Sequence, residues 1–176
     1  AKAMKKALVL FTILAFLTAV LALWQLQLSQ SDFLLFSLFA VIAIIAAITY
    51  TVGKKAYGYL GLGDMFVFLF FGLLSVGGTY YLFAKEWSWL ILLPAASVGF
   101  LSAGVLNLNN MRDHLGDAQS GKSTLVVKLG FKNAKIYHSF LLLLPFLCAA
   151  AYTIGTGIKG YNQWFFIITA PIFAQQ

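Results

Sequence analysis

Residues 7–28, ALVLFTILAFLTAVLALWQLQL, form an apolar stretch without a single charged side chain, and this stretch decides the fold class. A helix needs about 20 such residues to cross the hydrocarbon core of a bilayer. Further stretches of this kind are Phe33–Tyr50, Met65–Phe83, Trp87–Leu108 and Ser139–Ile158, and a sixth begins near Gln163. We therefore predict an all-α, polytopic transmembrane helix bundle with five full spans and the start of a sixth.

The composition excludes a water-soluble domain. Of the 176 residues, 61% are hydrophobic and 10% are charged, whereas an ordinary soluble domain has about 45–50% apolar and about 25% charged residues. There is too little polar surface to cover a globule, so lipid must be the solvent. We expect an integral membrane protein whose surroundings are the lipid bilayer.

The positive charges are distributed unevenly between the two sides of the membrane. Five successive spans place the connecting loops alternately on opposite sides, and of the 12 Lys and Arg residues only Lys85 and Lys159 fall on one of them. Because Lys and Arg collect in cytoplasmic loops, we expect the other, basic side to be cytoplasmic. Nucleic acid is not an expected partner, since these basic residues lie between membrane spans and no soluble recognition module is visible.

The loop after the fourth span carries a regular acidic pattern. Asn109, Asp113 and Asp117 are four residues apart, so they form one polar stripe if the helix continues past the bilayer. Two carboxylates on one face repel each other, and Mg²⁺ shared with phosphate oxygens would compensate them. Arg112 and Lys122 are suited to bind that phosphate. The alternative is an exposed helix end with ordinary solvated charges.

The stretch Gly116–Ser123, GDAQSGKS, also matches the nucleotide-binding pattern G-x-x-x-x-G-K-[ST]. A true P-loop follows a buried strand and opens a helix inside an α/β domain. Here the preceding residues are the end of a membrane helix, so we expect no ATP site. Gly121 and Lys122 still have the chemistry to approach a diphosphate.

A second cluster on the same side joins the second and third spans. Tyr50 and Lys54 are four residues apart at a helix end, and Asp64 directly precedes the apolar run that begins at Met65. Tyr and Lys at a membrane interface are often ordinary anchors. An ionisable group at the depth of Asp64 is a functional candidate by default.

Together these motifs resemble the UbiA-type intramembrane aromatic prenyltransferases. The resemblance is carried by Asn109-x-x-x-Asp113-x-x-x-Asp117, by the following Gly121-Lys122-Ser123-Thr124-Leu125, and by Tyr50-x-x-x-Lys54. The run YGYLGLGD, residues 57–64, is similar to the branch that prenylates 1,4-dihydroxy-2-naphthoate in menaquinone biosynthesis. The resemblance extends over nearly the whole chain.

The resemblance implies a nine-helix fold with two aspartate motifs, of which residues 1–176 would form a partial transmembrane domain, about the third to the eighth helix. The first aspartate motif would precede Ala1, so we expect a fragment that is inactive alone. The implied enzyme is a prenyltransferase of the bacterial inner membrane that takes a prenyl diphosphate and an aromatic acceptor, and releases diphosphate and CO₂. The implied metal is Mg²⁺.

Residue roles follow from the resemblance together with the residue chemistry. The expected roles are Mg²⁺ binding for Asp113, Asp117 and Asn109, diphosphate binding for Lys54, Arg112 and Lys122, and catalytic contacts for Asp64 and Tyr50. Tyr50 would hydrogen-bond a diphosphate oxygen, and Asp64 would orient or deprotonate the acceptor, whose own carboxylate would meet Lys54 or Lys55.

Three alternatives stay open at this point. The acceptor could instead be 4-hydroxybenzoate, homogentisate or a chlorophyllide. An ion-coupled transporter is a second alternative, although the spans have no acid at mid-depth and no visible inverted repeat. A membrane scaffold without catalytic activity is the third, and it leaves the acidic and basic loop unexplained.

Overall fold

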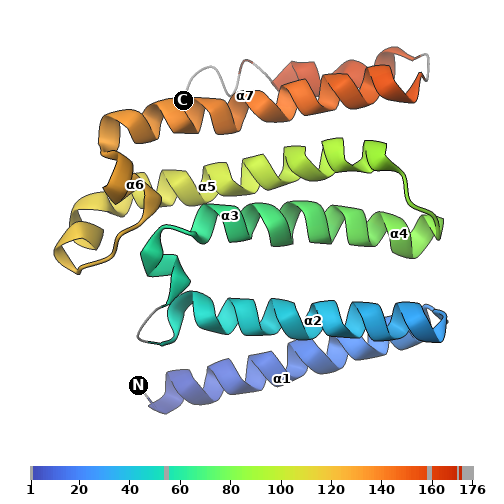
Figure 1. Ribbon diagram of the computed structural model, residues 1–176, viewed down its shortest axis with the longest axis horizontal. Helices are drawn as coiled ribbons and strands as arrows, with labels where there is room; N and C mark the ends of the chain where they lie inside the picture. The colour runs from blue at the N-terminus through green and yellow to red at the C-terminus, as the bar shows by residue number, and fades with distance from the viewer. Residues whose placement is uncertain (1, 54–55, 158–159, 170, 172–176) are drawn as a thin grey trace. The chain divides into compact units, whose positions relative to one another are not determined.

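The computed structural model describes residues 2–53, 56–157, 160–169 and 171, without the side chains of residues 2, 4 and 5. Figure 1 shows that the described chain is built from helices, and no strand occurs in it. The α-helices are α1 (Lys2–Gln25), α2 (Gln30–Thr51), α3 (Gly63–Val67), α4 (Gly78–Ala84), α5 (Leu92–Gln119), α6 (Leu125–Leu129) and α7 (Phe131–Thr156). A π-helix, Phe68–Gly77, joins α3 to α4, and short 3₁₀ helices cover Tyr57–Leu60, Trp89–Ile91 and Tyr161–Thr169.

Five helical stretches of the described chain are long and apolar enough to cross a membrane. They are Lys6–Gln25, Gln30–Thr51, Gly63–Ala84, Trp89–Gln119 and Phe131–Thr156. The predicted all-α membrane architecture with five spans is therefore confirmed. The chain divides into two compact units, Ala1–Ala56 and Tyr57–Gln176, and each is described by itself.

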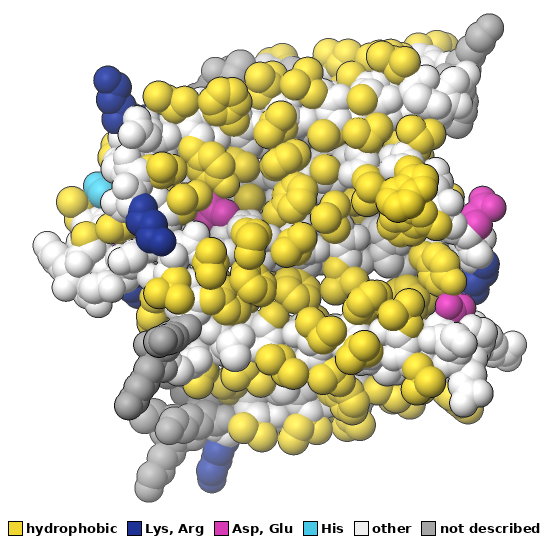
Figure 2. Space-filling view, viewed as in Figure 1, with side chains coloured by type: hydrophobic (Ala, Val, Ile, Leu, Met, Phe, Trp, Pro, Cys, Tyr) yellow, Lys and Arg dark blue, Asp and Glu magenta, His cyan; other side chains and the backbone are white. Residues whose placement is uncertain are grey.

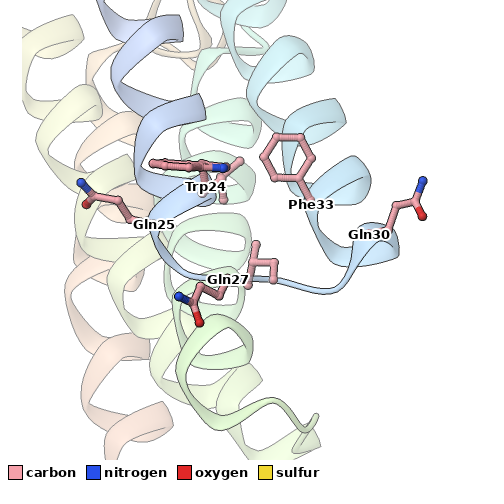
Figure 3. Close-up of a pocket in the computed structure, with 7 residues that line it drawn as sticks. Trp24, Gln25, Gln27, Gln30 and Phe33 are labelled. Atoms are coloured by element: carbon pink, nitrogen blue, oxygen red, sulfur yellow. The ribbon is translucent and has the colours of Figure 1, made fainter.

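The first unit is a helical hairpin of α1 and α2. In the turn, the Ser29 hydroxyl accepts a hydrogen bond from the Asp32 backbone N–H at 3.1 Å, and Asp32 lies in the first turn of α2. A capping hydroxyl and an acid at a helix N-terminus both stabilise that end. An open groove of about 720 Å³ lies at this turn (Figure 3) and is lined by Leu23, Trp24, Gln25, Gln27, Leu28, Gln30 and Phe33. It has no charged lining residue, so it lacks the groups that would bind a diphosphate.

The second unit packs the span Gly63–Ala84 against α5 at an unusually short distance. A Cβ atom placed on Gly72 would lie 2.6 Å from the Ala95 carbonyl oxygen and 2.6 Å from the Gly99 Cα atom. Small residues permit such close approach of membrane helices. Gly72 and Gly99 therefore serve the packing of these two spans.

Helices α5 and α7 are joined by polar contacts within the bilayer span. The Ser97 hydroxyl donates to the Pro145 carbonyl at 3.2 Å, and the Asn107 side-chain amide donates to the Ala134 carbonyl at 3.3 Å. Asn107 is fully buried. Hydrogen bonds between helices contribute to association where lipid gives no hydrophobic driving force.

Charged side chains of this unit lie at the ends of its helices, and hydrophobic side chains fill the middle of the face seen in Figure 2. Helix α5 continues to Gln119, past the predicted span end at Leu108, and α7 begins at Phe131, before the predicted start at Ser139. The predicted ends were placed where the hydropathy of the sequence falls, which is where a span leaves the bilayer. Both helices continue beyond that point into the polar region. The start of the expected sixth span is a 3₁₀ helix, in which the Gln163 N–H bonds to the Gly160 carbonyl.

Candidate active site

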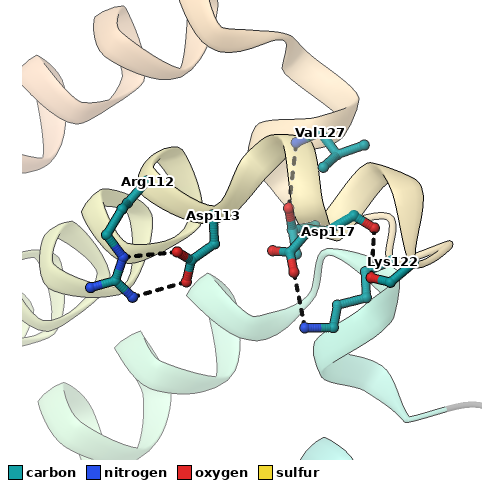
Figure 4. A network of polar contacts seen from close by, with 7 residues as sticks. Arg112, Asp113, Asp117, Lys122 and Val127 are labelled. Carbon is teal, nitrogen blue, oxygen red and sulfur yellow. Dashed lines mark hydrogen bonds and ion pairs between the residues drawn. The ribbon is translucent and has the colours of Figure 1, made fainter.

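Two acid–base pairs lie at the end of α5, which contains Asn109, Asp113 and Asp117 as the predicted helical extension requires. In the first pair, Arg112 Nε is 2.8 Å from Asp113 Oδ1 and Nη2 is 2.9 Å from Oδ2 (Figure 4). Both side chains are exposed. A guanidinium binds a phosphate with the same forked geometry.

The second pair joins Asp117 to Lys122 across the turn that ends α5. Lys122 Nζ is 2.9 Å from Asp117 Oδ1, and Asp117 is buried. The hydrogen bond and the charge of Asp117 raise the pKa of Lys122 above its usual value. The pair therefore contributes to stability throughout the neutral range, and this contribution is lost only as the pH rises through the raised pKa.

The four charged groups form one cluster, because the charge of Lys122 also acts on Asp113. Each carboxylate is compensated by a cation of the same chain, and Asn109 is exposed one turn before Asp113. Among the described residues, no group of three or more His, Cys, Asp and Glu is placed to hold a metal ion. Mg²⁺ commonly takes one or two carboxylates and fills its other positions with water and phosphate oxygens. The two carboxylates present fit a divalent cation in that shared form.

An apolar cavity of about 300 Å³ lies in the same unit. Its lining residues come from the segment after the first 3₁₀ helix, from the span Gly63–Ala84, and from α5, α6 and α7: Gly61, Asp64, Met65, Phe68, Phe100, Ala103, Leu125, Tyr137, Phe140, Leu141 and Leu144. Of these lining residues, only Asp64 has a carboxyl side chain.

Asp64 shares this cavity with Tyr137 of α7, and both residues line it. Asp64 is 6% exposed, and its Oδ2 atom has no hydrogen-bond partner among the described residues. Tyr137 is absent from the predicted site residues, because its only signal in the sequence is a polar side chain near the start of a span.

Hydrogen bonds connect the segment that follows the charged cluster to the segment that leads into the cavity wall. The Ser123 N–H donates to the Tyr59 carbonyl at 2.9 Å, and Lys128 Nζ donates to the Leu60 carbonyl at 2.6 Å. Gly61 has φ +74°, and a Cβ atom there would lie 2.9 Å from the Ser123 carbonyl oxygen. Because Gly61 also lines the cavity, the segment that follows Lys122 packs directly on the cavity wall.

The remaining predicted residues belong to the first unit. Tyr50 lies in the last turn of α2 and is half-buried. Lys54 and Lys55 lie outside the described residues. The structure thus brings Arg112, Asp113, Asp117 and Lys122 into one cluster and places Asp64 in the adjoining cavity.

Comparison with known proteins gives the family. Residues 2–175 match the UbiA prenyltransferase family. The chain belongs to this family. It is 43% identical over 175 residues to a 1,4-dihydroxy-2-naphthoate octaprenyltransferase of Haemophilus influenzae, covering 99% of the chain and 56% of that protein. It is 41% identical over 173 residues to the protein of the same name in Escherichia coli, covering 98% of the chain and 56% of that protein.

A more distant relative has a related acceptor in its name. The 2-carboxy-1,4-naphthoquinone phytyltransferase of Synechocystis is 33% identical over 84 residues, which cover 48% of the chain and 27% of that protein. No solved structure matches the chain. The chain spans a little over half the length of the two bacterial relatives. Members of the family generally depend on a divalent metal ion.

Proposed function

We propose that the protein transfers a polyprenyl group from a prenyl diphosphate to 1,4-dihydroxy-2-naphthoate in menaquinone biosynthesis. The observation that supports this most is a charge-paired cluster attached to an apolar cavity that contains one buried carboxylate. A cluster of this kind suits a diphosphate, and the cavity suits an aromatic ring. The names of the two bacterial relatives support the choice of acceptor.

In the proposed reaction, the allylic C–O bond breaks and its electron pair leaves with the diphosphate. A ring carbon forms a bond to the allylic carbon, and the ring carboxylate leaves as CO₂, which returns its bonding pair to the ring. Apolar walls keep water from the allylic cation before the ring reacts. The cavity lined by Phe68, Phe100 and Phe140 has this character.

The cations of the cluster bind the diphosphate by exchanging partners. Arg112 and Lys122 each hold a carboxylate, and each has the donors to bind phosphate oxygens instead. Lys54 adds a third cation, and Tyr50 donates a hydrogen bond to a diphosphate oxygen.

The carboxylates that these cations release are the groups that would hold the metal ion. Asp113 and Asp117 would hold Mg²⁺, and Asn109 would orient this site. When bound, the ion neutralises charge on the leaving diphosphate. Two carboxylates one helical turn apart would repel each other without such a cation.

Asp64 orients the acceptor. A buried carboxylate oxygen without a partner is well suited to accept a hydrogen bond from a ring hydroxyl. The whole site faces the cytoplasm in a bacterial inner membrane, because the loops on this side carry most of the Lys and Arg residues. ATP has no role in this reaction.

An acceptor comparison tests the proposal. The protein produced from its complete gene, purified in detergent with lipid, is given Mg²⁺, octaprenyl diphosphate and either 1,4-dihydroxy-2-naphthoate or 4-hydroxybenzoate. Mass spectrometry of the products is expected to show a prenylated naphthalenediol without the carboxylate, and little product from the benzoate. Equal use of both acceptors, or no transfer to the naphthoate, would overturn the proposal.

A further inference from the structure

We propose that Lys128 is a positioning residue for the aromatic acceptor: its ammonium group holds the Leu60 carbonyl and thereby fixes the cavity wall that begins at Gly61. The inference rests on the proposed function, which supplies the acceptor. It gives a role to a lysine of α6 that lies outside both the charged cluster and the cavity lining.

The contact joins two distant parts of the chain. Lys128 Nζ donates to the Leu60 carbonyl at 2.6 Å, and the two residues are 68 positions apart in the sequence. Lys128 is exposed, so water is available to its ammonium group as an alternative partner. Holding a long lysine side chain in one conformation costs entropy. A short, charge-assisted bond to one carbonyl offsets this cost and ties the two segments together.

The carbonyl that Lys128 holds lies directly before the cavity wall. Leu60 ends the first 3₁₀ helix, and Gly61, the next residue, lines the cavity together with Asp64. Gly61 has φ +74°, a conformation that other residues rarely adopt. The Leu60 carbonyl belongs to the peptide group that enters this turn. A bond to it therefore fixes the direction in which the chain enters the wall.

Lys128 projects from a firmly packed support. Its helix, α6, is anchored by Val126, which is 1% exposed and forms one buried cluster with Met111 of α5 and Ala134 of α7. The turn packs closely on this support, because a Cβ atom on Gly61 would lie 3.2 Å from Lys128 Nζ. The position of the wall is thus set by the core of the second unit through the lysine.

The contact acts on the acceptor side of the site. Lys122 belongs to the charged cluster, whereas Lys128 bonds to the segment that leads into the apolar cavity. The cavity volume of about 300 Å³ is at the lower end of the range for small-molecule sites. A displaced wall therefore changes the fit of an aromatic ring. We expect loss of the contact to weaken acceptor binding and to leave diphosphate binding unchanged.

The first test compares Lys128→Met with Lys132→Met, which removes another exposed lysine at the start of α7. In the protein produced from its complete gene, Lys128→Met is expected to raise the KM for 1,4-dihydroxy-2-naphthoate about fivefold, the loss of one hydrogen bond of ordinary strength. The KM for prenyl diphosphate should stay unchanged. Lys128→Arg, which keeps a cationic donor, should recover most of the loss, and Lys132→Met should change neither KM.

Hydrogen–deuterium exchange followed by mass spectrometry tests the contact without any substrate. Peptides that cover residues 57–62 are expected to exchange up to about fivefold faster in Lys128→Met than in the wild type, because this segment would open more often. Peptides from α5 should exchange at the wild-type rate. Lys132→Met should leave both sets of peptides unchanged, since it removes a charge without releasing the segment.

The outcomes distinguish this inference from the proposed function. An unchanged KM for the naphthoate in Lys128→Met, with a wild type that prenylates it, would overturn the inference, and so would unchanged exchange of residues 57–62. A raised KM for prenyl diphosphate would also overturn it, because the lysine would then bind that substrate. A wild type that transfers no prenyl group to the naphthoate would overturn the proposed function, while the exchange would still show whether Lys128 holds the cavity wall.

Discussion

Arg112 and Asp113 are neighbours in the sequence, and neighbouring residues on a helix usually point in different directions. The long side chain of Arg112 nevertheless reaches the Asp113 carboxylate in a forked ion pair beyond the end of the apolar span. The acidic stripe that the sequence predicted is therefore already neutralised within the chain. A charged ligand that binds at this cluster must therefore replace one partner in these ion pairs.

This exchange predicts the effect of removing single carboxylates. Asp113→Asn or Asp117→Asn, in the protein produced from its complete gene, should lower kcat by about 10²–10³, the typical loss when one group that stabilises transition-state charge is removed. Turnover is measured at saturating Mg²⁺ and prenyl diphosphate, and membrane insertion by the yield of protein in the membrane fraction. Near wild-type kcat in both variants would contradict the metal assignment.

Ser123→Ala is the control for these variants. In a true P-loop this hydroxyl binds Mg²⁺, whereas here Gly116 and Asp117 lie in the last turn of a helix and no strand precedes them in the described chain. The expected result is a kcat within about twofold of wild type. A loss as large as that of Asp117→Asn would favour the nucleotide-site interpretation.

Local patterns predicted the charged residues of the site but not its tertiary contacts. Spacing along one helix was enough to group Asn109, Asp113 and Asp117, because helical periodicity is a local property. The cavity that Asp64 and Tyr137 line together depends on how α7 packs in the second unit. No periodicity in the sequence encodes that packing.

At the scale of helices, the close contact between the π-helix and α5 gives a stability prediction. Gly72→Ala should lower the thermal unfolding temperature, because its Cβ atom would meet backbone atoms of Ala95 and Gly99 at 2.6 Å, and overpacking costs about 1–3 kcal/mol. Gly104→Ala is the matched control: this glycine is also buried in a span, but the nearest atom to its Cβ position is 3.8 Å away. Unfolding is followed by size-exclusion chromatography after heating.

The control is expected to unfold at or above the wild-type temperature, since alanine favours a helix more than glycine does. Equal unfolding temperatures for Gly72→Ala and Gly104→Ala would show that the close approach of these helices does not limit stability.

The five spans were predictable because length and hydropathy alone determine whether a helix can cross the bilayer. Their ends were less predictable. Helix α5 runs on to Gln119 because the residues after Leu108 are polar but contain no helix breaker until the turn at Gly121, where φ is +76°. The π-helix at Phe68–Gly77 has no local signal that we recognise in the sequence.

At the scale of the whole molecule, the second unit combines apolar spans with a charge-paired cluster at the end of α5. The prediction of one domain over residues 1–176 stays a prediction, and the chain covers 56% of its bacterial relatives. Within Tyr57–Gln176, the cluster and the cavity adjoin. A diphosphate at the cluster and a ring in the cavity would therefore react as a pair, and each turnover should consume both.

The most direct measurement follows diphosphate and CO₂ together during turnover. The protein produced from its complete gene receives prenyl diphosphate, Mg²⁺ and 1,4-dihydroxy-2-naphthoate labelled with ¹⁴C in its carboxylate. The account predicts that released diphosphate and labelled CO₂ rise in equal amounts, and that neither appears when either substrate is left out. Diphosphate released at the same rate without the naphthoate, or without labelled CO₂, would contradict the account.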